Sequence, residues 1–149
     1  MNNVFDHSES KIPGYTFTQY NSSLNQIITC VCDFGLGIPN KINSYLKQNG
    51  EPTLDNMSAL LKSFENKFST KTKEHNKGFG WDLIFSNVIG LNSKMLIISN
   101  NCLFWQLNNC KNKVNVIKGN FPGTCVIIYL DTQYLPENEG EYSDELKIL

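Results

Sequence analysis

The sequence predicts an α/β two-layer sandwich in which helices cover one face of a mixed, mostly antiparallel sheet. Three observations lead to this fold class: two strand-like segments near the N-terminus, helix-like segments in the middle of the chain, and strand-like segments over residues 94–130. The 149 residues suffice for one domain with its own core. We expect that domain to span residues 1–131, with an acidic tail over residues 132–149.

The first strands are expected to form a hairpin. Apolar and polar residues alternate over residues 15–19, after a turn at Pro13-Gly14, and a stronger apolar run covers residues 24–33. The polar stretch 21–23 between them is typical of the turn of an antiparallel hairpin. Residues 1–10, ahead of the hairpin, are interpreted as the last turns of a helix.

Two helices are expected next. Residues 39–50 predict a helix with Pro39 in its first turn and Gly50 at its end. Residues 53–68 carry a second helical pattern, with Thr53 as the expected N-cap. The apolar face of this second helix would hold Leu54, Met57, Leu60, Leu61 and Phe64.

The C-terminal half is expected to hold one more helix and three or four strands. A polar loop over residues 69–80 precedes an apolar helix over residues 81–91. Turn-like residues at Asn100-Asn101 and at 108–113 divide the apolar segments that follow. The expected strands are residues 94–99, 102–107, 113–119 and 123–130.

Charge and composition exclude several classes of partner. The net charge is −1, which gives no electrostatic case for nucleic acid or an anionic membrane as the main partner. All thirteen basic residues are lysine, so phosphate contacts would come from lysine, backbone N–H groups or a metal. The sequence has neither an N-terminal signal-like run nor an apolar stretch long enough for a membrane span, and we expect a cytoplasmic protein.

The five cysteines are odd in number and form no Cys-x-x-Cys pair. Cys30 and Cys32 are two residues apart in an expected strand, so they share one face of it. We interpret the cysteines as buried reduced thiols in preference to a zinc site or a disulfide framework.

Three glycine-containing stretches stand out: "DFGLGIP" at 33–39, "NKGFGWDL" at 76–83 and "FPGT" at 121–124. In the first, Asp-x-Gly-x-Gly leaves a strand; in the second, Gly-x-Gly opens an apolar helix; in the third, Gly-Thr starts a strand. Glycine lets backbone approach a ligand closely, and the first N–H groups of a helix point at an anion. The second stretch therefore predicts a phosphate cradle, with Lys71, Lys73 and Lys77 adding positive charge.

This series resembles the GHKL superfamily of Bergerat-fold ATPases, which includes gyrase B subunits, mismatch-repair ATPases, sensor histidine kinases and anti-sigma-factor kinases. The resemblance covers residues 3–130 and is closest to small bacterial stand-alone members. It implies ATP and Mg²⁺ as ligands. Asp33 would accept a hydrogen bond from the adenine amino group, while Gly35 and Gly37 would shape the wall of the binding site.

The resemblance also assigns the other two glycine stretches. The second glycine box matches Gly78 and Gly80, and backbone amides from Gly78 to Trp81, with Phe79 among them, would face the phosphates together with Lys77. The third box matches Gly123 and Thr124. The sequence departs from the family at Trp81, where leucine is usual, and this change bears on how tightly phosphate would be held.

The family's metal-binding helix is matched only at its end, by "NNVFDHS" at residues 2–8. Asn3 would be the Mg²⁺ ligand, with Asp6 and His7 on the same side of the helix as the ligand. Family members that hydrolyse ATP usually carry a glutamate one turn before this asparagine, and no such position precedes Asn3. We therefore expect the start of the helix and the strand before it to be missing, and we assign no catalytic residue.

The resemblance implies an ATP-binding module with a lid over residues 40–77 that couples nucleotide state to a protein partner. One alternative is an active serine/threonine or histidine protein kinase of the anti-sigma type, with its general base upstream of Met1. A second alternative is an interaction fragment that keeps the fold and acts without nucleotide. ATPase or kinase activity is left open.

Overall fold

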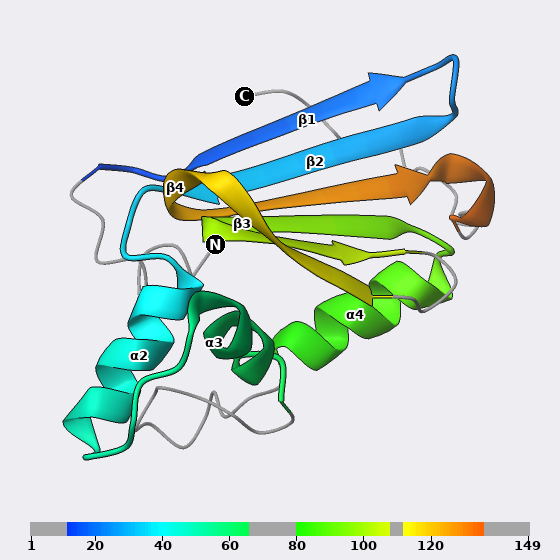
Figure 1. Cartoon of the computed structure of the whole chain (residues 1–149). Coiled ribbons are helices and arrows are strands. Elements are labelled where there is room, and N and C mark those ends of the chain that lie inside the picture. Colours follow the sequence, from blue (N-terminus) through cyan, green and yellow to red (C-terminus); the bar gives the residue numbers. More distant parts are fainter. Residues whose placement is uncertain (1–11, 66–79, 108–111, 136–149) are drawn as a thin grey trace, which may run out of the picture.

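The computed structural model describes residues 12–65, 80–107 and 112–135. They form a four-stranded sheet and helices that pack on it (Figure 1). The elements, in chain order, are β1 (Tyr15–Asn21), β2 (Gln26–Asp33), α2 (Ile38–Gln48), α3 (Asn56–Lys62), α4 (Gly80–Gly90), β3 (Lys94–Gln106), β4 (Asn112–Asp131) and the short 3₁₀ helix η2 (Thr132–Tyr134).

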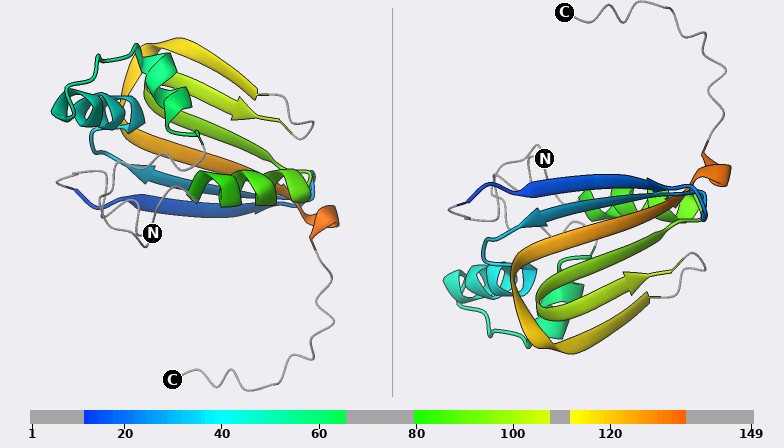
Figure 2. Two further views of the ribbon diagram at one scale, coloured as in Figure 1. Left: turned by 90° about the horizontal axis from the view of Figure 1, so that it is seen from below. Right: turned by 90° about the horizontal axis from the view of Figure 1, so that it is seen from above.

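The sheet has the strand order β1-β2-β4-β3, and its neighbouring strands are antiparallel. The predicted hairpin is confirmed, with Tyr15 opposite Cys32 and Asn21 opposite Gln26. Seen from below, α3 and α4 lie in front of the sheet, and seen from above the sheet lies in front of α4 (Figure 2). The predicted α/β class, with helices on one face of a mostly antiparallel sheet, is therefore confirmed.

The last two strands are longer than expected. We predicted separate strands on either side of Asn100-Asn101 and within residues 113–130, but β3 and β4 each run through these breaks. Asn100 adopts φ +51° and the register shifts on both sides of it, so it is a kink within β3 and not the end of a strand. Opposite this kink, β4 curls at the same end of the sheet (Figure 1).

Helix α2 lies where the sequence predicted it, with Pro39 in its first turn and Gly50 directly after its end at φ +73°. The N-cap predicted for α3 was wrong. Asp55, not Thr53, caps this helix, and its Oδ1 accepts from the backbone N–H groups of Met57 and Ser58 at 3.0 Å. The predicted apolar face was also too wide, because Leu54 lies ahead of the helix and Leu61 is exposed.

The hydrogen bonds of the cap act on the charge state of Asp55. The Ser58 hydroxyl, followed by the backbone N–H groups of the first turn, holds the pKa of this exposed carboxyl below its ordinary value of 3.8. The stabilisation by the charged cap is therefore present above the ordinary pKa and is lost as the pH falls through the lowered value.

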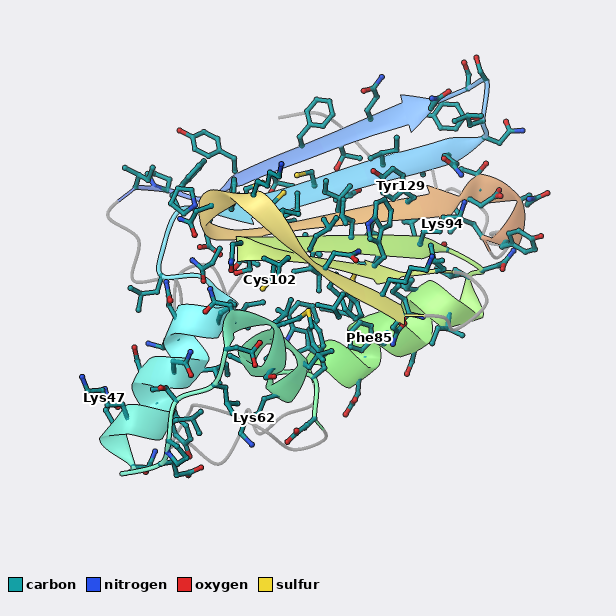
Figure 3. All side chains as sticks on the ribbon, viewed as in Figure 1. Lys47, Lys62, Phe85, Lys94, Cys102 and Tyr129 are labelled. Carbon is teal, nitrogen blue, oxygen red and sulfur yellow. The ribbon has the colours of Figure 1, made fainter. Side chains whose placement is uncertain are left out.

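The main core lies between the sheet and helices α3 and α4. Buried residues from both layers meet there, and Figure 3 shows the labelled side chains Phe85 and Cys102 between the helices and the strands. An aromatic cluster closes one side of this core: the ring of Phe64, after α3, lies 5.2 Å from Trp81, 5.3 Å from Phe85 and 4.7 Å from Phe104. The fully buried members of the core are Leu60, Val88, Met95, Ile97, Cys102 and Phe104.

A second, smaller cluster joins α2 to α3 through Ile42, Leu46 and Ala59, which are all nearly inaccessible to solvent.

No helix among the described residues is long and apolar enough to cross a membrane. The helix end expected at residues 1–10 and most of the tail expected at residues 132–149 lie outside the described residues. The division of the chain at residue 131 stays a prediction.

Candidate functional site

Three segments meet at one end of the sheet, where β2 runs into α2 and where β3 and β4 bend (Figure 1). They are residues 33–38, the pair Ser99-Asn100, and the pair Gly123-Thr124. We refer to these residues as the glycine junction. Two of the three glycine stretches singled out in the sequence, "DFGLGIP" and "FPGT", therefore lie side by side, because the register of β2 and β4 places Asp33 directly opposite Thr124.

Asp33 is the last residue of β2 and belongs to the face of the sheet that the helices cover. Residues opposite each other in an antiparallel pair share a face, and Thr124 in turn is opposite Ser99, next to the buried core residue Ile97 on β3. The Oδ1 atom of Asp33 accepts a hydrogen bond of 2.9 Å from the backbone N–H of Gly35. This local turn orients the carboxylate. Among the residues that the structure describes, none donates to its Oδ2 atom.

Phe34 fixes the outer side of the same turn. Its ring packs edge to face on Tyr15 of β1, with centroids 5.9 Å apart, and lies 5.8 Å from Phe121 of β4. Such aromatic pairs favour one orientation of the turn between β2 and α2. The direction of the Asp33 side chain is thus supported from both neighbouring strands.

The hydroxyl of Ser99 joins the three segments. It is fully buried, accepts from the backbone N–H of Ile38 at 2.8 Å and donates to the carbonyl of Gly123 at 2.9 Å. Helix α2 has no side-chain cap of its own, so Ser99 supplies the missing acceptor at its N-terminus. A serine hydroxyl has one proton, and it is used on Gly123, so Thr124 donates in the 3.1 Å contact between the two hydroxyls.

Gly37 is glycine because of a neighbouring side chain. Its φ is +78°, and a Cβ placed there would lie 2.6 Å from Oδ1 of Asn100. Asn100 is itself 3% exposed and donates from Nδ2 to the carbonyl of Leu36 at 3.1 Å. We expected a ligand to approach the glycines of this loop closely; at Gly37 the close neighbour is Asn100, a part of the protein.

The amide of Asn100 is only half satisfied. Its Oδ1 is buried and has no hydrogen-bond partner among the described residues. A buried polar atom without a partner costs free energy, so an unpaired acceptor at the N-terminal end of α2 is a feature that selection for stability alone would remove.

Gly123 is the second position at which the backbone conformation and a close contact require glycine. Its φ is +112°, and a Cβ there would lie 2.2 Å from the carbonyl oxygen of Asp33 and 2.8 Å from its Oδ1. The glycine of the "FPGT" stretch therefore lets β4 approach the end of β2, which brings Thr124 beside Asp33.

The second glycine stretch is described only from Gly80 onward. Helix α4 begins at Gly80, as predicted, but Lys77, Gly78 and Phe79 lie outside the described residues. Trp81 packs into the aromatic cluster, stacked on Phe85 with centroids 5.8 Å apart, so the indole is accommodated in place of the leucine usual in the family. Asp82 places a carboxylate in the first turn of α4, which suits the helix dipole but opposes a phosphate at the same place.

Two further predictions concern residues that the structure does not describe or describes only in part. Asn3, predicted to hold Mg²⁺, lies outside the described residues. Part of the range predicted for a lid, residues 40–77, is packed into the domain, because Ile42, Leu46 and Leu60 are buried in the two cores. These side chains make α2 and α3 parts of the packed domain, and only the remainder of the range is left for a lid.

Sequence reasoning missed Ser99 and Asn100. Asn100 was recognised only as a turn residue, and its positive φ agrees with that part of the interpretation. The signal that was available is an Asn-Asn pair between two apolar strand segments, since asparagine is the residue type that most readily takes this conformation after glycine. Ser99 gave no signal, because its role depends on a contact with Ile38, 61 positions away.

The junction thus presents an acceptor and a hydroxyl on adjacent strands, on the face of the sheet that carries the helices. Adenine offers a donor for that acceptor in its amino group. Asp33 carries the acceptor with no described donor at Oδ2, and Thr124 holds its hydroxyl in place through Ser99.

Comparison with known proteins gives a partial likeness. No protein-family model matches the sequence, and no curated protein matches it. Among solved structures, the chain is similar to the ATPase region of Saccharomyces cerevisiae topoisomerase II bound to ICRF-187 (dexrazoxane), with a TM-score of 0.44 and 16% identity. A second structure of that ATPase region gives a TM-score of 0.42 and 15% identity. Both matches cover 89% of this chain and 34% of the other, so the chain spans about one third of that region's length.

Proposed function

We propose that the chain is an adenine-nucleotide-binding module of the Bergerat type, with ATP as its ligand. The observation that carries the proposal is the pairing of Asp33 with Thr124 on the helix-bearing face of the sheet, at the point where β2 enters α2. Of their sequence contexts, Asp-x-Gly-x-Gly is the motif that the resemblance to GHKL ATPases assigns to the adenine side of the site, and Gly-Thr matches the third glycine box of those proteins. The proposal assigns no catalytic residue.

Each residue of the junction has a defined part in this proposal. Asp33 accepts from the adenine amino group through Oδ2, while its Oδ1 stays bonded to Gly35. Thr124 is held beside it by Ser99. Gly123 and Gly37 contribute by their size, because they let β4 and Asn100 pack closely enough to keep this arrangement.

The phosphate side of the proposal rests on the sequence alone. Backbone amides from Gly78 to Trp81, with Lys77, would face the phosphates, and Mg²⁺, bound through Asn3, would neutralise their charge. The N-terminus of α4 at Gly80 is consistent with this placement, whereas the carboxylate of Asp82 in the same turn weakens it.

A calorimetric titration of the 149-residue protein with ATP and Mg²⁺ tests the proposal, with GTP as the matched control. We expect one ATP to bind per chain and GTP to bind at least about tenfold more weakly, because guanine presents a carbonyl acceptor where adenine presents its amino group. If neither nucleotide binds, the nucleotide-independent interaction fragment becomes the better description of this chain. Equal binding of both would remove Asp33 from the recognition of the base.

The lid and its coupling to a protein partner stay predictions, since residues 66–77 lie outside the described part of the chain. If a lid closes on ATP, addition of ATP and Mg²⁺ should slow cleavage by trypsin between Lys62 and Lys77 relative to cleavage at lysines elsewhere. Mass spectrometry of the first fragments gives the cleavage sites. The same rate at these sites with and without nucleotide would speak against a lid.

A further inference from the structure

Three of the cysteines come together on the sheet face opposite the glycine junction. Cys30 and Cys32 are two residues apart on β2, and Cys125 of β4 is directly opposite Cys32. The Sγ atom of Cys125 lies 2.9 Å from that of Cys32 and 3.4 Å from that of Cys30, and the two β2 sulfurs are 3.4 Å apart. We call these residues the thiol cluster.

The pairing of β2 with β4 creates the thiol cluster and also fixes its location. Asp33 and Thr124 form the next pair along the same two strands, so they point to the opposite face of the sheet. The thiol cluster is therefore separate from the proposed nucleotide site, although the two share neighbouring backbone positions. It was not foreseen in the sequence, where Cys125 is 93 positions away from Cys32.

The thiol cluster is partly accessible to solvent and has apolar neighbours. Cys30 and Cys32 are half-buried and Cys125 is 7% exposed. The residues opposite them on β1 are Phe17 and Tyr15, whose side chains are largely exposed. An ion in solution can thus reach the sulfurs from the open face, while strand backbones hold them in place.

We infer that the thiol cluster is a binding site for one thiophilic d¹⁰ metal ion, Zn²⁺ or Cu⁺, with the three sulfurs as ligands. Thiolate sulfur is the ligand type that selects these ions over Mg²⁺ and Ca²⁺. Three sulfurs that bind one Zn²⁺ at about 2.3 Å lie about 3.8 Å apart, so the present separations need to open by less than about 1 Å.

The chemistry of binding is an exchange of protons for the ion. Each of the three thiols releases its proton to solvent, three metal–sulfur bonds form, and no electron is transferred. Burial raises the pKa of the Cys32 and Cys125 thiols. Zn²⁺ bound by three thiolates keeps a fourth position open for water, whereas Cu⁺ accepts three sulfurs alone. The coordination number therefore distinguishes the two ions.

Two competing uses of these sulfurs are weaker. The three thiols are free in the structure, and the shortest separation, 2.9 Å, is well beyond the ~2.05 Å of a disulfide bond. A disulfide would also engage only two of the three sulfurs and leave Cys30 without a role. Passive core packing does not require three sulfurs in mutual contact on the more exposed face of the sheet, while Cys102 shows what a packed thiol looks like here: fully buried between sheet and helices.

The test is titration of the full chain, stripped of metal and kept reduced with a sulfur-free reductant, with Zn²⁺ and with Cu⁺ against a chromophoric chelator for each. We expect one ion per chain. Co²⁺ used as a spectroscopic probe should give thiolate-to-metal charge-transfer absorption, and the intensity of its visible bands should indicate four-coordination. The preferred ion is the one whose chelator loses more of its bound metal to the chain.

Single variants assign the ligands. Cys30→Ser and Cys32→Ser should each weaken binding at least tenfold and remove most of the Co²⁺ charge-transfer band, and these half-buried positions should tolerate serine better than Cys125. Cys102→Ala is the control: it removes a thiol that lies outside the cluster, in the core between sheet and helices, and binding should stay within about twofold of the unaltered chain. Circular dichroism and thermal melting without metal establish that each variant folds.

Either of two results would overturn the inference. The reduced chain could bind neither ion with 1:1 stoichiometry, or a folded Cys30→Ser variant could bind as tightly as the unaltered chain. Because nucleotide is absent from these titrations, their outcome does not depend on whether the proposed ATP site is correct.

Discussion

Replacement of Asp33 by asparagine is expected to weaken ATP binding by about 100-fold while the protein stays folded. Asparagine keeps the oxygen that accepts from the backbone N–H of Gly35, so the turn between β2 and α2 is retained. The other oxygen becomes an NH₂ group, which turns an acceptor for the adenine amino group into a donor facing a donor. A buried hydrogen bond to a charged group contributes about 1.5–3 kcal/mol, and the loss corresponds to one to two orders of magnitude in Kd.

The measurement is calorimetry on both proteins, with Asp131→Asn as the matched control. Asp131 ends β4 as Asp33 ends β2, and its Oδ1 likewise accepts from the backbone N–H two residues on, that of Gln133. It lies at the far end of the β2–β4 pair, opposite Gln26, so its replacement should leave the Kd for ATP unchanged. An Asp33→Asn protein that binds ATP as tightly as the unaltered chain would show that this carboxylate does not read adenine.

The substitution Gly123→Ala should have the largest effect on stability. The added Cβ would lie 2.2 Å from the carbonyl oxygen of Asp33, and the φ of +112° is one that alanine rarely adopts. Backbone strain and forced displacement each cost about 1–3 kcal/mol, so a loss of about 3 kcal/mol is expected. For a chain of this length that corresponds to a fall in Tm of about 10 °C.

Gly119→Ala is the control for this prediction. Gly119 lies in the same strand, but a Cβ there meets nothing within 4 Å and its φ is not in the left-handed range. Differential scanning calorimetry of the two variants should therefore show a large fall in Tm for Gly123→Ala and almost none for Gly119→Ala. Equal Tm values would mean that β4 can shift away from Asp33 at little cost, and the close approach described here would lose its structural importance.

Much of the fold followed from periodicity and turn chemistry. The hairpin of β1 and β2, helix α2 with its Pro39 start and Gly50 end, and helix α4 from Gly80 depend on local sequence, and each was predicted nearly at its observed bounds. One error was local, and the other came from a tertiary contact. Asp55 replaced Thr53 as the cap of α3, and the pairing of β3 with β4 carried both strands through the kink at Asn100.

The candidate site was predictable to a smaller extent. Asp33, Gly37 and Thr124 were singled out from motifs, and the structure brings them into one junction. Ligand approach at Gly37 stays a prediction, while the observed contact that requires its small size is with Asn100, which no local pattern reveals. The thiol cluster and the role of Ser99 arise from strand register, and register is set by pairing between distant segments that a single sequence does not display.

The pairing of β2 with β4 has a consequence for the order in which the chain folds. The β1–β2 hairpin and the β3–β4 pair are each local, but their union joins residues up to 105 positions apart, such as Gln26 and Asp131. Closing so long a loop costs entropy before its contacts form, so this step is expected late in folding. Both the pair of Asp33 and Thr124 and the thiol cluster arise only at that step. During synthesis, both groups of side chains can therefore come together only after β4 has been made.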